Sequence, residues 1–81
     1  MTICVLAFAR LREILQRPEL RVDLPETASA NDAWAALVRD YPSLAAERAT
    51  TRLARNGRLV KFEEALCDGD ELALLPPVGG G

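Results

Sequence analysis

The start of the chain is apolar on both faces of a possible strand. Residues 2–8 are short, apolar and partly β-branched, which predicts a strand. We expect positions 3, 5 and 7 to face a core. The other face carries Cys4, Leu6 and Phe8, which are also apolar, so it is expected to be covered by a further element or by a partner.

Alternation continues further along, at residues 20–24. There apolar and charged residues take turns, which predicts a half-buried strand with Leu20, Val22 and Leu24 directed inward. Between the two strands, residues 10–16 place their apolar side chains at helical spacing. A proline two positions later ends this helix, because the residue before a proline avoids the helical region.

The main helix is predicted to begin after Ser29. Ser29 and Asp32 have the spacing of a capping box, in which each side chain bonds to the other residue's backbone N–H. Apolar residues then repeat at helical spacing up to about residue 40. We expect Trp34 and Leu37 to make the main contribution of this helix to the core.

Strands dominate the second half of the chain. The Asn-Gly pair at 56–57 is a strong hairpin signal, because both residues tolerate positive φ. The expected order is a helical turn at 43–49, a strand at 51–55, a returning strand at 58–62, a tight turn at 68–70 and a last strand at 71–75.

Helices therefore interrupt a mixed sheet of about five strands, which predicts an α+β fold with the main helix packed on one face of the sheet. Pro76 and Pro77 forbid further ladder pairing. We expect one domain at 1–75 and a flexible C-terminal tail at 76–81. A chain of 81 residues closes one small core.

Composition excludes several classes of partner. Apolar residues make up 49% of the chain and charged residues 27%, which is typical of a globular protein. No apolar run reaches the roughly 18 residues that a membrane helix needs, and the apolar start has no basic leader. We therefore expect a cytoplasmic protein with no membrane partner. The net charge of −2 gives no reason to expect nucleic acid.

The distribution of charge says more than its sum. All charged residues at positions 48–61 are basic, and all charged residues at positions 63–71 are acidic. One interpretation is a surface that steers a charged protein partner. The other is a set of solvated hairpin and loop faces. The sequence leaves both open.

Catalytic side chains are scarce. The chain has no histidine, so the commonest general base and the usual Cys/His zinc spacing are absent. Cys4 and Cys67 are expected to be buried thiols that act as small apolar residues. The two serines, Ser29 and Ser43, stand at expected helix starts, and no phosphate-binding glycine loop is present. A self-sufficient enzyme is not predicted.

The C-terminus is the candidate reactive group. Three terminal glycines have no side chains, so they can carry a backbone carboxylate into a channel too narrow for other sequences. Six residues from Pro76 reach on the order of 20 Å at about 3.3 Å per residue. A free carboxylate is a poor electrophile. An acyl-adenylate of Gly81 is reactive, and sulfur can then replace the adenylate to leave a thiocarboxylate.

These residues make the chain resemble the small subunit of molybdopterin synthase, a ubiquitin-like β-grasp sulfur-carrier family. The resemblance runs from end to end. It rests on residues 8–13 after the first strand, on the Asn-Gly hairpin, and above all on the Asp-Gly-Asp-Glu turn at 68–71 followed by Pro-Pro-Val at 76–78 and a terminal Gly-Gly. The double glycine alone is shared by all ubiquitin-like carriers, whereas the whole combination is far more specific.

The resemblance implies a sulfur-carrier function. An E1-like adenylating enzyme uses ATP to activate Gly81, a sulfur donor protein forms the thiocarboxylate, and the tail then enters the large subunit of a heterotetramer, which supplies the catalytic side chains. The chain itself is expected to bind no cofactor and no metal. The residues implied at the reacting end are Gly81 and Gly80. Those implied in partner binding are Phe8, Arg12, Leu75, Pro76, Pro77, Val78 and Gly79.

Some questions stay open at this level. Arg55 stands where relatives have an apolar residue, and no role can be assigned to it. The same tail chemistry would serve a sulfur carrier for thiamin, cysteine or tRNA thiolation. A ubiquitin-like interaction module or modifier, which joins Gly81 to a lysine through an isopeptide bond, is a further alternative of another class.

Overall fold

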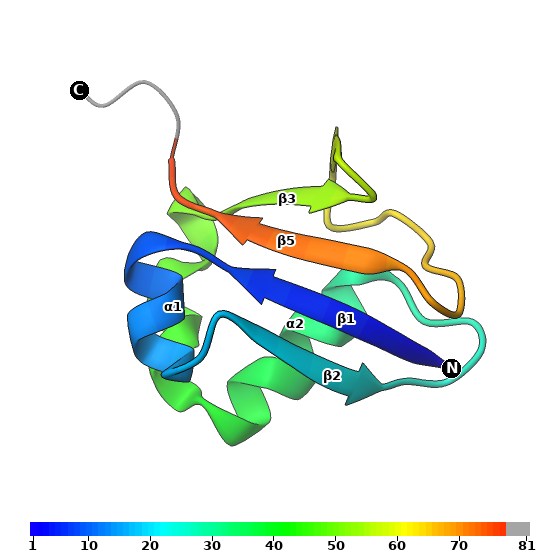
Figure 1. Cartoon of the computed structure of the whole chain (residues 1–81), viewed down its shortest axis with the longest axis horizontal. Helices are drawn as coiled ribbons and strands as arrows, with labels where there is room; N and C mark the ends of the chain where they lie inside the picture. Colours follow the sequence, from blue (N-terminus) through cyan, green and yellow to red (C-terminus); the bar gives the residue numbers. More distant parts are fainter. Residues whose placement is uncertain (78–81) are drawn as a thin grey trace.

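The first and last strands of the chain lie side by side in one sheet. The computed structural model describes residues 1–77. Its elements are β1 (Thr2–Ala7), α1 (Ala9–Leu15), β2 (Glu19–Asp23), α2 (Ala30–Asp40), the 3-10 helix η1 (Pro42–Thr50), β3 (Arg52–Arg55), β4 (Arg58–Val60) and β5 (Glu71–Leu75). The strand order is β2-β1-β5-β3-β4, and α2 crosses one face of the sheet (Figure 1). The predicted α+β fold is confirmed.

The sheet is mixed because β1 has two kinds of neighbour. It pairs antiparallel with β2 and parallel with β5, and β5 pairs antiparallel with β3. The predicted alternation of β1 is confirmed: Ile3 and Val5 are at most 1% exposed on the inner face. Cys4 and Leu6 are half-buried on the outer face, which no helix covers.

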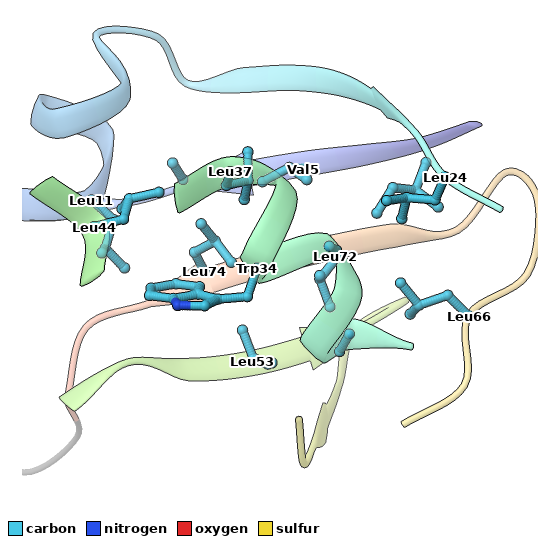
Figure 2. Packing of buried hydrophobic residues seen from close by; sticks show 14 of the residues in the cluster. Val5, Leu11, Leu24, Trp34, Leu37, Leu44, Leu53, Leu66, Leu72 and Leu74 are labelled. Atoms are coloured by element: carbon cyan, nitrogen blue, oxygen red, sulfur yellow. The ribbon is translucent and has the colours of Figure 1, made fainter. Parts of the chain in front are cut away.

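The core lies between the inner face of the sheet and α2. Figure 2 shows Trp34 of α2 among Leu53, Leu72 and Leu74 of the sheet, and all four side chains are buried. The Trp34 ring meets Phe62 edge to face, with 5.7 Å between the ring centroids. This geometry matches the quadrupoles of the two rings. Trp34 is therefore a core residue, as its position on the helix predicts.

The start of α2 also sets the course of a distant segment. The predicted capping box is present, since Ser29 N–H donates to Asp32 Oδ2 at 2.8 Å and Asp32 N–H donates to Ser29 Oγ at 3.3 Å. The first two helical N–H groups, of residues 30 and 31, donate to the carbonyl oxygens of Glu64 and Phe62 at 2.8 Å. Helix starts need such acceptors, because their first N–H groups have no partner within the helix.

This contact corrects one predicted boundary. The returning strand was expected to reach residue 62, but β4 ends at Val60. The chain leaves the sheet there because the backbone of Phe62 caps α2 and its ring packs on Trp34. The other predicted elements are present within one or two residues of their expected bounds, and the helical turn expected at 43–49 is the 3-10 helix η1.

The hairpin between β3 and β4 has the predicted two-residue loop. Asn56 and Gly57 have φ values of 50° and 86°, and Arg55 pairs with Arg58 across the turn. Both loop residues are in the left-handed region, as this tight connection requires.

Arg55 now has a physical role. Its Nε donates to Asp70 Oδ2 at 2.7 Å, and its Nη1 donates to Glu64 Oε2 at 3.1 Å. Asp70 is 6% exposed and also accepts from the Cys67 N–H at 2.7 Å and from Asn56 Nδ2 at 2.9 Å. The carboxylate thus ties the hairpin to the turn before β5.

We expect Trp34→Ala to lower the free energy of unfolding by about 3–5 kcal/mol, because it leaves a cavity at the centre of the core. Urea unfolding followed by circular dichroism measures this change. Leu59→Ala is the control, since Leu59 is 60% exposed and its removal should change stability by less than about 0.5 kcal/mol. An equal effect of the two substitutions would show that Trp34 does not hold the core together.

We expect Asp70 to make stability depend on pH. Burial raises the pKa of Asp70, but the hydrogen bonds from Cys67, Asn56 and Arg55 outweigh burial and hold this pKa below its ordinary value. The carboxylate therefore stabilises the fold above the pKa of an unfolded aspartate, about 4, and this contribution is lost as the pH falls toward the lower folded pKa.

Urea unfolding between about pH 6 and pH 3 tests this dependence. Asp70→Asn should be less stable than the wild type at the upper end and should lose less stability as the pH falls. Asp40→Asn, at an exposed position, is the matched control and should keep the wild-type slope. If Asp70→Asn also keeps that slope, the network does not contribute through the charge of Asp70.

Candidate functional site

The candidate tail begins at a fixed point beside β1. β1 and β5 run parallel, with Leu6 paired to Ala73 and Ala7 paired to Leu74. Both strands therefore end on the same side of the sheet, and the end of β5 lies beside the start of α1 (Figure 1). The next position along each strand is Phe8 on one side and Leu75 on the other. The register thus brings together two of the predicted partner-binding residues.

Phe8 is displayed by the turn that joins β1 to α1. It is the N-cap residue of α1, with extended φ and ψ of −129° and 154°, and its carbonyl oxygen accepts from the Leu11 N–H at 3.1 Å. Ala9 follows with φ of 52°, a conformation that costs a non-glycine residue about 1–2 kcal/mol. The sharp turn leaves the Phe8 side chain 45% exposed. A large aromatic so exposed favours a role in binding.

A row of apolar side chains crosses the outer face of the sheet. Ala73 of β5 pairs with Leu6 on one side and with Ala54 on the other, and Ala54 pairs with Leu59 of β4. Residues paired directly across strands share a face. We call this set, with Phe8 and Leu75 at the tail end, the outer apolar row. Phe8 and Leu59 are the large apolar residues that stand out as exposed in the described part of the chain.

Leu59 was not predicted as a site residue. Its signal was available in the hairpin, because a two-residue loop at 56–57 pairs Arg55 with Arg58 and then Ala54 with Leu59. That register puts Leu59 on the face opposite to Leu53, which is in the core. The sequence does not show that β3 and β5 are neighbours, so the hairpin register alone does not connect Leu59 with β5 and the tail.

Two exposed arginines lie beside Phe8 and Leu75. Arg12 is in the last turn of α1, one turn after Phe8, and Arg52 is paired with Leu75 at the start of β3. Neither forms a salt bridge among residues 1–77, whereas Arg10 on the same helix is bound to Glu47 at 3.0 Å. These two guanidinium groups are available to an acidic partner.

Most of the basic stretch is occupied within the molecule. Arg55 and Arg58 form salt bridges with Glu64 at 3.1 and 3.3 Å, and the Arg48 guanidinium lies 3.9 Å over the Phe62 ring. The basic and acidic stretches of the sequence thus neutralise each other across the hairpin. This arrangement favours the interpretation as hairpin and loop faces over a large steering surface.

The cysteine prediction was wrong. Cys67 is exposed and Cys4 is half-buried on the outer face, and both are free thiols. Burial, followed by the nearby Glu19 carboxylate, raises the pKa of Cys4, so this thiol stays protonated at neutral pH. The sheet is covered by helices on one face alone, so the outer side of β1 does not become a second core.

Residues 1–77 hold no cluster of three or more His, Cys, Asp or Glu side chains that could bind a metal ion. Among the same residues, no helix has the length and apolarity that crossing a membrane requires. Pro76 and Pro77 are described and exposed directly after β5. Val78, Gly79, Gly80 and Gly81 lie outside the described residues. The described part of the candidate site is therefore the exposed surface around Phe8, Leu75 and the two prolines.

Comparison with known proteins gives consistent results. The model of the ThiS family matches residues 5–81. The molybdopterin synthase sulfur carrier subunit of Chlamydomonas reinhardtii is 37% identical, and the match covers 100% of both chains. Small archaeal modifier protein 1 of Haloferax volcanii is 38% identical over 91% of this chain and 94% of its own length. The crystal structure of SAMP1 from Haloferax volcanii has a TM-score of 0.89 at 35% identity, with 100% of both chains covered.

The mixed five-stranded sheet and the helix across it define a ubiquitin-like β-grasp protein. The chain belongs to the ThiS family. The resemblance to the sulfur-carrier subunit of molybdopterin synthase, inferred from residues 68–81, is confirmed by full-length relatives of that name.

Proposed function

We propose that this chain is the sulfur-carrier subunit of a molybdopterin synthase and that Gly81 carries the sulfur as a thiocarboxylate. The observation that carries the proposal is the position of the tail root. β5 lies between β1 and β3 and leads directly into Pro76, at the end of the sheet where Phe8 is exposed. A partner that recognises this end of the sheet receives the last residues of the chain at a fixed starting point.

The chemistry divides between the chain and its partners. The carboxylate of Gly81 attacks the α-phosphorus of ATP bound by an E1-like adenylating enzyme, and pyrophosphate leaves. The persulfide of a donor protein then attacks the acyl carbon and AMP leaves, which gives an acyl disulfide. A second thiol cleaves the S–S bond of this acyl disulfide, so that the thiocarboxylate is released and the two thiols end as a disulfide. This chain supplies the carboxylate and its recognition surface, and it holds no cofactor itself. Because activation consumes ATP, we place the reaction in the cytoplasm.

The large subunit is the proposed acceptor of the tail after Gly81 has become a thiocarboxylate. Phe8, Leu59 and Leu75 offer it an apolar surface, and Arg12 and Arg52 offer charges at the rim. An interface with an apolar centre and a polar rim is typical of specific protein complexes. The three glycines can then carry the thiocarboxylate to the bound pterin precursor, with Pro76, Pro77, Val78 and Gly79 in contact with the entrance. The proposed assembly is a heterotetramer.

Conjugation to proteins is a second candidate function. It is favoured by the 38% identity to a relative named as a modifier protein. In that case a lysine amine attacks the activated Gly81 acyl group, AMP leaves and an amide bond forms. The two functions share the activation step and differ in the nucleophile that follows, which is sulfur in one and an amine in the other.

We expect deletion of Gly81 to abolish sulfur transfer without unfolding the protein, because the tail follows the last strand of the domain. The measurement is the intact mass of the chain isolated from cells that contain its activating enzyme. The wild type should show the exchange of one oxygen for sulfur, and the deletion variant should not. Thermal melting of both proteins supplies the control, and Asn31→Ala, an exposed change on α2, should be charged like the wild type.

Two other outcomes would count against this proposal. An unmodified carboxylate, under conditions that charge a known carrier, would contradict the sulfur-carrier function. Amide-linked adducts of Gly81 in place of sulfur would support the modifier function. A melting temperature that falls together with activity in the deletion variant would mean that the tail belongs to the fold.

We expect Phe8→Ala and Leu59→Ala each to weaken binding to the large subunit by about tenfold or more, since exposed apolar anchors contribute about 1–2 kcal/mol or more when they fill a partner pocket. Isothermal titration calorimetry with the chain that carries no sulfur on Gly81 measures the affinity for the large subunit. Asn31→Ala, on the opposite side of the sheet, should bind normally. Unchanged affinity in both apolar variants would exclude the outer apolar row as the docking surface.

A further inference from the structure

The outermost strand β2 leaves one side of its backbone open. It pairs only with β1 in the described part of the chain. Met1 and Leu24 exchange backbone hydrogen bonds at 2.6 and 2.7 Å, and the Ala7 N–H donates to Pro18 O at 2.9 Å. Because hydrogen-bonded pairs alternate along an antiparallel ladder, the even-numbered residues of β2 direct their backbone groups to β1.

The odd-numbered residues of β2 therefore face the open side. Glu19, Arg21 and Asp23 direct their N–H and C=O groups away from β1. The register of the ladder is continuous along β2, so no bulge turns this edge away. The edge offers a regular row of main-chain donors and acceptors to another strand.

Four charged side chains alternate in sign along this edge. Arg17, Glu19, Arg21 and Asp23 are exposed, in the order positive, negative, positive, negative. The first three line one hollow on the outer face of the sheet, and Asp23 accepts from Thr2 Oγ1 at 2.7 Å on the same face. None of the four forms a salt bridge among residues 1–77. A strand that pairs here has to match this order, because like charges directly across a ladder are destabilising.

This order is complementary to itself in a second, antiparallel copy at one position of the twofold axis. With the axis at Arg21, Arg21 faces its own equivalent and Glu19 faces Asp23, which is repulsive. With the axis at Leu20, Glu19 faces Arg21 of the other copy and Arg17 faces Asp23, each pair occurring twice by symmetry. All the charges then face opposite charges. Odd-numbered residues still pair with odd-numbered ones, as the open backbone groups require.

The opposite shift matches less well. With the axis at Val22, Arg21 faces Asp23, but Glu19 faces Pro25, which has neither a charge nor an N–H to donate. Half of the charged pairs are then lost. The charges therefore favour the axis at Leu20.

The same register matches the inner face of the strand. Leu20 faces Leu20 of the other copy, and Val22 faces Pro18. Leu20 and Val22 are half-buried and line a hollow between β2 and α2. Arg39 and Asp40 also line this hollow, but they form a salt bridge with each other at 3.8 Å. A second copy thus covers the apolar side chains that the helix leaves half-exposed.

We propose that two copies of this chain associate through antiparallel pairing of their β2 strands, with the twofold axis at Leu20. The two sheets then form one continuous sheet. Each Glu19–Arg21 pair exchanges main-chain hydrogen bonds and forms an ion pair on the outer face. A twofold interface of this kind is closed, so association ends at the dimer.

The dimer leaves both tail roots accessible. β1 separates β2 from β5, so the new interface does not include the last strand. The twofold axis directs the two β5 strands in opposite directions, and each copy can bind its own partner through the outer apolar row. The dimer does not depend on the sulfur-carrier function, and loss of Gly81 should leave it unchanged.

Sedimentation equilibrium of the full chain, at concentrations up to about 1 mM, measures the association, because a small interface gives a weak dimer. We expect a monomer–dimer equilibrium that weakens with added salt, since the ion pairs lie in water. In the ¹⁵N-labelled chain, the amide signals of Glu19 and Arg21 should shift with concentration.

Charge reversal tests the register. Glu19→Arg and Arg21→Glu each place like charges in both symmetric pairs, so each variant alone should dimerise about tenfold or more weakly than the wild type. An equal mixture of the two variants should associate about as strongly as the wild type, because the two reversed residues then face each other. Lys61→Glu is the matched control. It makes the same change of charge in the exposed segment after β4, at the other side of the sheet, and should dimerise normally.

Three results would overturn the proposal. The first is a wild-type chain that stays monomeric at about 1 mM. The second is a dimer that both charge reversals leave intact, with concentration-dependent shifts at Phe8 and Leu59, which would assign association to the outer apolar row. The third is a mixture of the two variants that associates no better than either variant alone. Thermal melting of each variant shows that loss of the dimer is not loss of the fold.

Discussion

The parallel pairing of β1 with β5 is the constraint on which the rest of the structure depends. These strands come from opposite ends of the chain, and the Cys4 N–H donates to Asp70 O at 2.9 Å where they first meet. Their inner side chains, Val5 and Leu74 among them, are fully buried. A parallel pair needs a crossover connection, and here the whole domain between the two strands is that crossover. β1 and β5 cannot pair unless every intervening element is in place.

This constraint suits the proposed function, in which the end of the chain reacts. A terminal segment is normally the least ordered part of a protein. Here the residue before the prolines, Leu75, belongs to a strand with neighbours on both sides. At the other end of β5, Asp70 binds the hairpin through Arg55 and Asn56. The last strand is thus fixed at both ends.

Much of this architecture could be predicted from the sequence because it depends on local signals. The alternation of β1, the capping box of Ser29 and Asp32 and the turn at 56–57 each act within a few residues. The features that could not be predicted depend on distant pairs. The chain leaves the sheet before Phe62 because the Phe62 carbonyl oxygen accepts a hydrogen bond from the start of α2. Arg55 is half-buried because it forms a salt bridge with Asp70. Composition alone does not show which strands are neighbours.

The same limit applied to the candidate site. Phe8, Leu75 and the prolines could be named from the resemblance, whereas Leu59 became visible only when the register was followed across β5 and β3. The expectation that Cys4 is buried was wrong for a related reason, since the sequence does not show whether a further element covers the outer face of β1. In the described part of the chain the helices lie on one face of the sheet, so the outer face stays open. Leaving Phe8 and Leu59 in water gains the fold nothing. An exposed apolar row beside the root of a glycine tail is therefore best explained by the partner that receives the tail.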